Sequence, residues 1–374
     1  MGFLQSDNKS KAEILNEQFQ SVFTKEIINN FPNKGKSPYS TMEDIKINSK
    51  GVHTHLKNLK PHKAIGPDSI PSFILKAAAD QLAPILTELY QTSLNTGVVP
   101  QDWKDAHVVP LFKKDERHLA SNYTMIPVSL TSMTCKVMEH IVHSSVMGHF
   151  DRNKILTNAQ HGFRKKRSCE SQLIVTIHDI ASKLERDSQV DIILLDFAKA
   201  FDKVPHHRLL HKLEYYGVNP KTNRWIRSFL ENREQSVILE GTVSMQVQVL
   251  SGVPQDTVLG PLLFLAYTND MPETATSSEI KLFADDSLLY RTINNQTDSH
   301  LLQRDLTILE DWKNIWQMSF NAKKCIVIRI APKNKQVRQT SYKLHGRNLD
   351  NVEASKYLGV TINNNLSMAK ETRR

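Results

Sequence analysis

The chain has 374 residues, 40% of them hydrophobic, and a formal net charge of +9 at pH 7. This length and composition exclude a wholly disordered protein and leave room for two or three packed subdomains. The excess of Lys and Arg favours a polyanionic partner, because cations that neutralise phosphates release condensed counterions, although many basic proteins are merely soluble.

The cysteines and the N-terminal sequence indicate in which cellular compartments the protein is expected. Three cysteines are far apart in the chain: Cys135, Cys169 and Cys325. This spacing predicts neither a zinc ribbon nor a disulfide framework and favours a reducing compartment. Because the N-terminus has no apolar export segment and the most apolar run, 259–267, is too short to span a bilayer, we expect a protein of the nucleus or cytoplasm with no membrane contact. Gly2 with Ser6 matches the myristoylation pattern, which is a weak signal.

Residues 1–50 are expected to form a helix followed by a linker. Ser10 and Glu13 have the spacing of a capping box ahead of an apolar helical periodicity that includes Phe19. The polar, proline-containing stretch 29–44 then predicts a linker.

The rest of the chain mixes helix and strand signals. Helical periodicity covers 70–94 and 173–184 and predicts two core-facing segments. Strands are predicted at Ala106–Phe112, Asp191–Leu195, Ser236–Glu240, Val243–Val249, Ile280–Phe283 and Cys325–Ile330. The fold class expected from this order is α+β.

Three carboxylates stand at the ends of these predicted strands. The apolar strand 191–195 delivers Asp196 at its end, which is a rigid place for a metal ligand. Asp285 and Asp286 lie between two short apolar runs and predict a β-hairpin with both acids at its turn. Two acids this close repel each other unless a cation joins them. Without further context, however, an Asp-Asp pair is more often a solvated hairpin tip.

The arrangement of these acids suits one kind of chemistry. Three oxygen ligands from two strands suit Mg²⁺, which keeps waters and substrate phosphates in its coordination shell. Nucleotidyl transfer uses two such ions about 3.5–4 Å apart, one activating a 3′-hydroxyl and the other steadying the leaving group. We therefore expect two Mg²⁺ ions, or Mn²⁺ in their place.

An ordered series of motifs gives the strongest sequence signal. They are LKPHKAIGPDSIP (59–71), PQDWKDAHVVPLFKK (100–114), NYTMIPVSLTS (122–132), QHGFRKKRS (160–168), LLDFAKAFDKVPH (194–206), SGVPQDTVLGPLLF (251–264), FADDSLLY (283–290), FNAKKC (320–325) and YLGV (357–360). Together they closely resemble the reverse transcriptases of LINE-type, non-LTR retrotransposons, from about residue 51 onward. The resemblance implies a nucleotidyltransferase, an RNA-directed DNA polymerase that adds dNTPs to the 3′-hydroxyl of a DNA primer on an RNA template.

The resemblance also implies a right-hand polymerase fold. Fingers would occupy 51–187 and an RRM-like palm 188–362, while 363–374 would be a truncated tail where a thumb should begin. The endonuclease that usually precedes this domain is not expected in the 50 residues before the first motif.

By this resemblance Asp196, Asp285 and Asp286 are the catalytic residues and metal ligands of the palm. Asp285 is the better candidate for a direct ligand, and Asp286 would mainly shape the hairpin. Phe201 matches the bulky steric gate that sits against the sugar C2′ and excludes ribonucleotides. Without the motif, Phe201 would be assigned simply to the core.

Further residues acquire nucleotide-handling roles in the same way. Gln255 would line the nucleotide pocket, ahead of a helix over 258–270, and Lys113 would meet the incoming triphosphate. Lys324 would protonate the departing pyrophosphate, although the adjacent Lys323 leaves the register open. On their own, these are ordinary loop and surface residues.

A basic run, Arg164, Lys165, Lys166 and Arg167, suits contacts with the backbone of template or primer. The alternative for any such run is a solvated face.

The chain departs from the family pattern at two places. Where the family has Asn-Tyr-Arg-Pro, Tyr123 is followed by Thr124-Met125-Ile126, so the arginine is missing and two residues are extra. Where the family has Pro-Gln-Gly, Asp256 replaces the glycine and places a side chain and a negative charge at a position whose backbone favours glycine. Both changes oppose triphosphate binding.

Three functions remain open from the sequence. The first is an active RNA-directed DNA polymerase, and the second is an inactive remnant that still binds nucleic acid through its basic surface. The third, an RNA-dependent RNA polymerase, is disfavoured by Phe201, because such enzymes need a polar group for the ribose 2′-hydroxyl.

Overall fold

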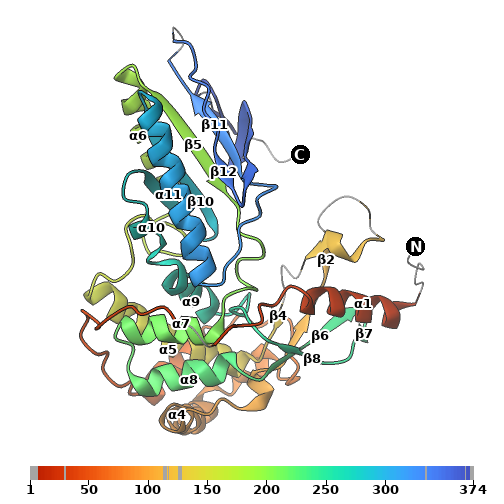
Figure 1. The fold of residues 1–374 in the computed structure, drawn as a ribbon. Helices are drawn as coiled ribbons and strands as arrows, with labels where there is room; N and C mark the ends of the chain where they lie inside the picture. The colour runs from red at the N-terminus through yellow and green to blue at the C-terminus, as the bar shows by residue number, and fades with distance from the viewer. Residues whose placement is uncertain are drawn as a thin grey trace. The chain divides into compact units, whose positions relative to one another are not determined.

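The chain forms two compact units in the computed structural model. Unit 1 comprises Met1–Ile155 and Phe201–Ala266, and unit 2 comprises Leu156–Ala200 and Tyr267–Arg374. The structure describes residues 7–28, 31–112, 116, 118–124, 129–332, 335–366 and 368–370. Both units contain helices and strands, so the predicted mixture of the two is confirmed (Figure 1).

Unit 1 is built around a sheet whose centre is β6. Its helices are α1 (Asn8–Gln20), α2 (Ser49–Lys57), α3 (Ser72–Ala77), α4 (Ala79–Thr96), α5 (Met133–Arg152), α7 (His206–Tyr215), α8 (Pro220–Leu230) and most of α9 (Leu259–Thr268), with 3₁₀ turns at Gln101–Trp103 and Ala120–Asn122. Its strands are β1 (Ala106–Val108), β2 (Leu111–Phe112), β3 (Tyr123–Thr124), β4 (Ser129–Leu130), β6 (Arg233–Leu239), β7 (Thr242–Val243) and β8 (Val247–Val249). β6 pairs in parallel with β1 and antiparallel with β7 and β8, β4 extends the sheet beyond β1, and β2 and β3 form a separate hairpin.

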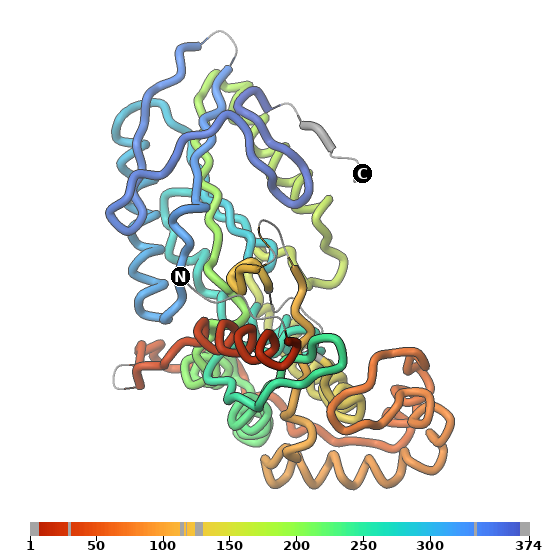
Figure 2. Tube along the Cα trace, turned by 90° about the vertical axis from the view of Figure 1, so that its right-hand side faces the viewer, coloured from red at the N-terminus to blue at the C-terminus, as the bar shows by residue number. Residues whose placement is uncertain are grey.

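Helix α1 closes one face of this sheet. It packs on β6, β7 and β8, as Figure 2 shows for the red helix beside the green strands. Ala12, Leu15 and Phe19 are buried against Val108 and Val237, which makes the helix part of the unit 1 core.

The start of α1 corrects the predicted capping box. The Asp7 carboxylate accepts a hydrogen bond from Ser10 N at 2.8 Å, so the helix begins ahead of Ser10. Glu13 instead accepts from Met245 N at 2.9 Å. The Ser10–Glu13 box is therefore wrong, because an earlier acid is the N-cap.

Several predicted elements are divided in the structure. The segment 70–94 forms α3 and α4, because the backbone leaves helical geometry at Ala78 (φ −91°, ψ 19°). The predicted strand 106–112 forms β1 and β2 on either side of Pro110, which has no N–H for a ladder. The predicted strand 243–249 is likewise divided between β7 and β8.

Unit 2 is organised on a second sheet of order β14-β11-β5-β10-β9. Its helices are α6 (Cys169–Glu185), α10 (Met271–Thr274) and α11 (Gln296–Ile315). Its strands are β5 (Gln189–Leu195), β9 (Glu279–Phe283), β10 (Asp286–Ile293), β11 (Ile326–Ile330), β12 (Lys343–Leu344), β13 (Arg347–Asn348), β14 (Asp350–Asn351), β15 (Ala354–Tyr357), β16 (Val360–Asn363) and β17 (Met368–Lys370). β12 pairs with β13, and β15, β16 and β17 form a small sheet.

Strand β5 is the buried centre of unit 2. Its run of apolar residues is typical of a strand covered on both faces. Helix α6 packs against β5 and α11 against β10, with α11 lying along the sheet in Figure 1. Ile192, Leu288 and Ile328 from the three central strands share one core with Ile180 of α6. This packing fixes the end of β5, where Asp196 follows.

In the part of the chain that the structure describes, no helix is both long and apolar enough to cross a membrane. The predictions for Gly2, Ser6, Lys113, 125–127 and 371–374 lie outside the described residues.

Candidate active site

The backbone of Asp196 is held at the end of the unit 2 sheet. Leu195 is the last residue of β5, a strand paired on both sides, with β10 and with β11. Asp196 N donates to Cys325 Sγ at 3.4 Å, and Asp196 O accepts from Asn321 N at 2.7 Å. Both contacts come from the segment before β11, so this acid does not depend on its side chain for its position.

A tight hairpin between β9 and β10 carries the other two acids. Phe283 pairs with Asp286, which leaves Ala284 and Asp285 as the turn residues. Ala284 has φ 55°, the left-handed backbone that a two-residue hairpin needs at its first turn position. The predicted hairpin is confirmed, but Asp286 is the first residue of β10 rather than a turn residue.

The strand register brings Asp286 and Asp196 together. Ser287 pairs with Leu195, so Asp286 and Asp196, the next residues on each antiparallel strand, are neighbours. Asp286 keeps solvent exposure. Even so, partial burial, followed by repulsion from Asp285 and Asp196, raises the pKa of Asp286 to about 6. This crowding of acids is what a bound cation relieves.

The acids at this end of the sheet have the donor chemistry for a divalent cation. Asp196 Oδ2 is buried and accepts no hydrogen bond, and its close charged neighbour is Lys324 Nζ at 3.3 Å. A cavity of about 170 Å³ opens beside Asp196 and Asp286 and is also lined by Lys356. Among the described residues, no three His, Cys, Asp or Glu side chains already converge as a ligand set. Asp196 and Asp286, with Asp285 beside them, are therefore the groups that could hold such an ion.

In unit 1, Phe201 stacks on a second ring. The rings of Phe201 and Phe264 are 4.4 Å apart between centroids and inclined by 17°. Phe264 is fully buried on α9, whereas Phe201 is only partly buried. One face of the Phe201 ring is thus supported by the core.

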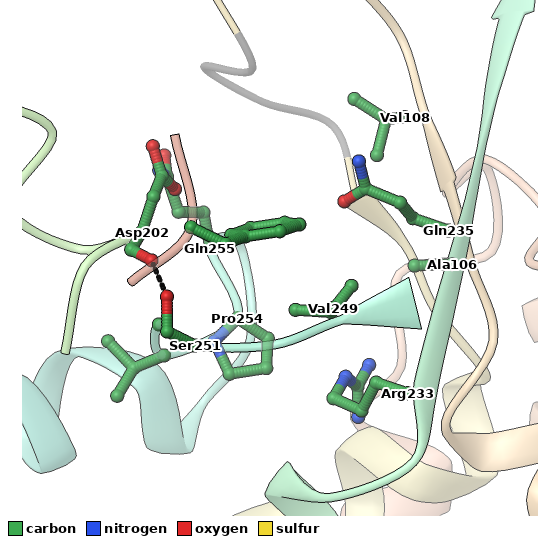
Figure 3. Close-up of a pocket in the computed structure, with 12 residues that line it drawn as sticks. Ala106, Val108, Asp202, Arg233, Gln235, Val249, Ser251, Pro254 and Gln255 are labelled. Atoms are coloured by element: carbon green, nitrogen blue, oxygen red, sulfur yellow. Dashed lines mark hydrogen bonds between the residues drawn. The ribbon is translucent and has the colours of Figure 1, made fainter. Parts of the chain in front are cut away.

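Gln255 lies in a loop that is bound to the segment after Phe201. Gln255 Nε2 donates to Asp202 Oδ1 at 2.7 Å. Ser251 Oγ donates to Asp202 O at 2.7 Å, the bond that the dashed line marks in Figure 3. Gly252 has φ 95°, and a Cβ there would lie 2.8 Å from Asp202 Cα, so this close approach requires glycine. The two segments border a small cavity of about 50 Å³ that Arg233 also lines.

Asp256 takes a backbone conformation that favours glycine. Its φ of 57° lies in the left-handed region, which agrees with the expectation drawn from the replaced glycine. Its carboxylate is paired, however, because Lys136 Nζ of α5 lies 3.4 Å from Asp256 Oδ2. The negative charge predicted to oppose triphosphate binding is thus partly balanced within unit 1.

Glu139, one turn further along α5, holds the end of the same loop. Its Oε2 accepts hydrogen bonds from Val258 N at 2.7 Å and Leu259 N at 3.0 Å, the start of α9. Glu139 is fully buried, and this burial raises the pKa of its carboxyl group. The loop 251–259 is therefore fixed by side chains on α5 and by Asp202.

The chain matches one described protein family. Residues 112–362 match the family described as reverse transcriptase (RNA-dependent DNA polymerase). The chain belongs to the reverse transcriptase family. The matched span includes every candidate site residue predicted from the sequence, from Lys113 to Lys324.

Relatives of this chain have names that refer to mobile elements. It is 27% identical over 328 residues to the "RNA-directed DNA polymerase from mobile element jockey" of Drosophila melanogaster, covering 85% of this chain and 35% of the relative. It is 28% identical over 326 residues to the "Probable RNA-directed DNA polymerase from transposon BS" of the same species, covering 83% and 35%. It is 23% identical over 254 residues to the "Retrovirus-related Pol polyprotein from type-1 retrotransposable element R2" of Popillia japonica, covering 64% and 34%. The chain spans about a third of the length of these relatives.

The four residues of the basic run have two different surroundings in the structure. The Arg164 guanidinium donates to Thr157 O at 3.0 Å, and that of Arg167 to Asn158 O at 2.7 Å. Lys165 and Lys166 are exposed instead. The two arginines thus hold the local chain, while the lysines are the side chains available to a polyanion.

Sequence reasoning missed four residues that support these features. Lys136, Glu139, Gln160 and Phe264 each contact a candidate residue or its loop or turn. Gln160 and Phe264 lie within two of the quoted motifs, 160–168 and 251–264, and Glu139 is an acid on a helix whose neighbours Val137, Met138 and Val142 are apolar. Lys136 has no such signal.

Proposed function

We propose that this reverse transcriptase performs RNA-directed DNA synthesis for a non-LTR retrotransposon, adding dNTPs to a primer 3′-hydroxyl on an RNA template. The observation that carries the proposal is the adjacency of Asp196 and Asp286 across β5 and β10, with Asp196 Oδ2 accepting no hydrogen bond. The names of the jockey and BS relatives support the same activity.

The sheet of unit 2 supports the proposal of an RRM-like palm. Its central strand β5 ends at Asp196, and the neighbouring β9–β10 hairpin carries Asp285 and Asp286. In this proposal the boundaries of fingers and palm remain those of the motifs, 51–187 and 188–362.

The proposed reaction is an in-line displacement. The primer 3′-oxygen forms a bond to the α-phosphorus of the dNTP, the bond from that phosphorus to the bridging oxygen breaks, and pyrophosphate leaves. Bound Mg²⁺, or Mn²⁺ in its place, would favour deprotonation of the 3′-hydroxyl and offset charge on the leaving group. Lys324, whose Nζ lies 3.3 Å from Asp196 Oδ2, would give a proton to pyrophosphate, while the 3′-hydroxyl proton would pass to solvent.

Phe201, Gln255 and Lys113 carry the nucleotide-binding roles in this proposal. The Phe201 ring, supported by Phe264, would exclude a ribose 2′-hydroxyl, and Gln255 would line the pocket. Lys113 would contact the triphosphate as a mobile point charge.

Primer extension tests the proposal directly. An oligo(dT) primer on poly(A) with dTTP and Mg²⁺ is expected to lengthen, and omission of the metal is expected to stop synthesis. A control template of poly(dA) separates RNA-directed from DNA-directed synthesis. No extension with either Mg²⁺ or Mn²⁺, at dTTP well above ordinary working concentrations, would reject the proposal.

A second function is favoured by the departures at 124–126 and Asp256: binding of nucleic acid without synthesis. Its test is the salt dependence of primer–template affinity, measured by fluorescence anisotropy. Replacing Lys165 and Lys166 with Ala should make the log–log slope shallower by about 2. The matched pair Lys25 and Lys36, also exposed, should leave the slope unchanged.

A further inference from the structure

Gln160 is a buried amide that grips the turn between β9 and β10. Only 2% of the residue is exposed. Its Oε1 accepts from Ala284 N at 2.9 Å and from Gly162 N at 2.7 Å, and its Nε2 donates to Ala284 O at 3.3 Å. Both polar atoms of the side chain are thus used on this turn or next to it.

The backbone around Gln160 runs beside β9. Leu282 N donates to Ala159 O at 2.9 Å, and His161 N donates to Leu282 O at 2.9 Å. Segment 159–162 therefore continues the sheet past its edge strand for a short distance, in parallel with β9. Gly162 allows the closest approach, because a Cβ there would lie 2.3 Å from Ala284 N.

Ala284 has a backbone conformation that needs support from hydrogen bonds outside the hairpin. Its left-handed φ of 55° is strained for a residue with a Cβ, and the usual occupant of that turn position is glycine. Gln160 bonds both the N–H and the C=O of this residue. The two acids follow directly, so any rotation of the Ala284 peptide moves Asp285.

Gln160 is itself anchored by the basic run. The Arg167 guanidinium donates to Gln160 O at 2.8 Å and to Asn158 O at 2.7 Å. This contact gives Arg167 a structural role at the base of the grip.

We propose that Gln160 is a positioning residue, whose carboxamide fixes the Ala284 turn and thereby the direction of Asp285 and Asp286. Its consequence for catalysis rests on the proposed function, whereas its consequence for the turn does not.

Hydrogen exchange tests the hold on the turn. In Gln160→Met the Ala284 amide loses its acceptor, so exchange in peptides covering 280–288 should accelerate by about tenfold. The matched control is Gln189→Met, which removes another buried amide, from the opposite end of β5. Gln160→Glu keeps the acceptor oxygen and should give intermediate protection. Equal exchange in Gln160→Met and the parent would overturn the proposal.

Metal binding tests the consequence for the acids. Mn²⁺ affinity, measured by electron paramagnetic resonance without nucleotide, should weaken by about three- to tenfold in Gln160→Met and be unchanged in Gln189→Met. In primer extension, kcat and the Mn²⁺ midpoint should change while the KM for dNTP does not. Unchanged Mn²⁺ affinity, with the parent binding the ion, would overturn the link to the acids. If the parent binds no Mn²⁺, the proposed function fails. The hydrogen-exchange result then decides by itself whether Gln160 fixes the Ala284 turn.

Discussion

The acids of unit 2 and the 251–259 loop of unit 1 are held by different means. Asp196 directly follows β5 and Asp286 begins β10, two strands whose hydrogen bonds run from backbone to backbone, and the Gln160 side chain adds a hold on the turn before Asp286. The loop that carries Gln255 is held by side chains from other segments, including those of Asp202, Lys136 and Glu139.

This difference predicts how each region responds to sequence change. A backbone ladder survives replacement of a side chain, so a changed acid should alter the chemistry of unit 2 and leave its fold intact. A loop fixed by side chains loses its geometry one contact at a time. The replacement of a glycine by Asp256 in that loop is a change of this second kind.

The largest effect is expected at the acids. Asp196→Asn and Asp285→Asn should each reduce primer extension by at least about 10³-fold, because a neutral amide is a poor ligand for Mg²⁺. Circular dichroism and thermal unfolding should match the parent. Asp311→Asn, an exposed acid on α11, is the control and should retain full activity. A folded Asp196→Asn protein that extends primers at the parental rate would remove the metal assignment.

Repair of the two departures should give the next largest effect. Replacing Asp256 with Gly and 124–126 with a single Arg should improve dNTP use by about two to four powers of ten, through a lower KM or a higher kcat. Single-nucleotide incorporation measures both constants. If the unrepaired chain already equals an intact family member, the departures are harmless.

The Lys136–Asp256 ion pair gives a second test of the effect of the Asp256 charge. Lys136→Met should raise the KM for dNTP about two- to fivefold, because the negative charge of Asp256 in the loop is then unbalanced. The same change in the Asp256→Gly background should have little effect. Equal effects in both backgrounds would show that the pair does not balance this charge.

The ring pair in unit 1 should affect selectivity rather than rate. Phe201→Ala should raise the use of rNTP relative to dNTP by roughly tenfold or more, because space opens at C2′. Phe264→Leu removes the stacked support and should shift the ratio in the same direction by less. Phe320→Leu, which breaks the Phe197 stack in unit 2, is the control and should lower both rates without changing their ratio. An unchanged ratio in Phe201→Ala would refute the gate.

His206 should give the support of the loop a pH dependence, an effect on stability rather than on activity. His206 Nε2 is 2.8 Å from Gly252 O, and burial lowers the pKa of His206 to about 4. The unfolded chain protonates this residue near pH 6.5, so unit 1 should be fully stable above that pH. Stability should then fall by roughly 2–3 kcal/mol as the pH drops from 6.5 to 4.

Hydrogen exchange in unit 1 peptides, which monitors unfolding at each pH of this range, measures the expected loss of stability. His206→Gln keeps a donor for Gly252 O and should reduce the pH dependence, whereas His62→Gln, an exposed control, should not. The same slope in His206→Gln and the parent would show that another group is responsible.

The regions that could be predicted from sequence are those with local signals. The strand ending at Asp196 and the hairpin of Asp285 follow from apolar runs, and the helix expected over 258–270 is observed at Leu259–Thr268. Gln160, by contrast, acts on a residue 124 positions away, and Glu139 on one 119 positions away. No periodicity or propensity reports contacts of that range. The capping box at Ser10 failed for a local reason, because Asp7 competes for the same turn.

Strand β6 pairs in parallel with β1, and helix α1 packs on it. Both contacts affect how the chain folds during its synthesis on the ribosome. Phe19 packs in a core with Val237, about 220 residues later in the chain. At ribosomal rates of roughly 5–20 residues per second, the apolar face of α1 waits some 10–45 s for its partner strand. Pairing across such a separation is also slow to form. The nascent chain should therefore depend on chaperones during synthesis, and truncation before β6 should yield aggregation rather than a smaller folded protein.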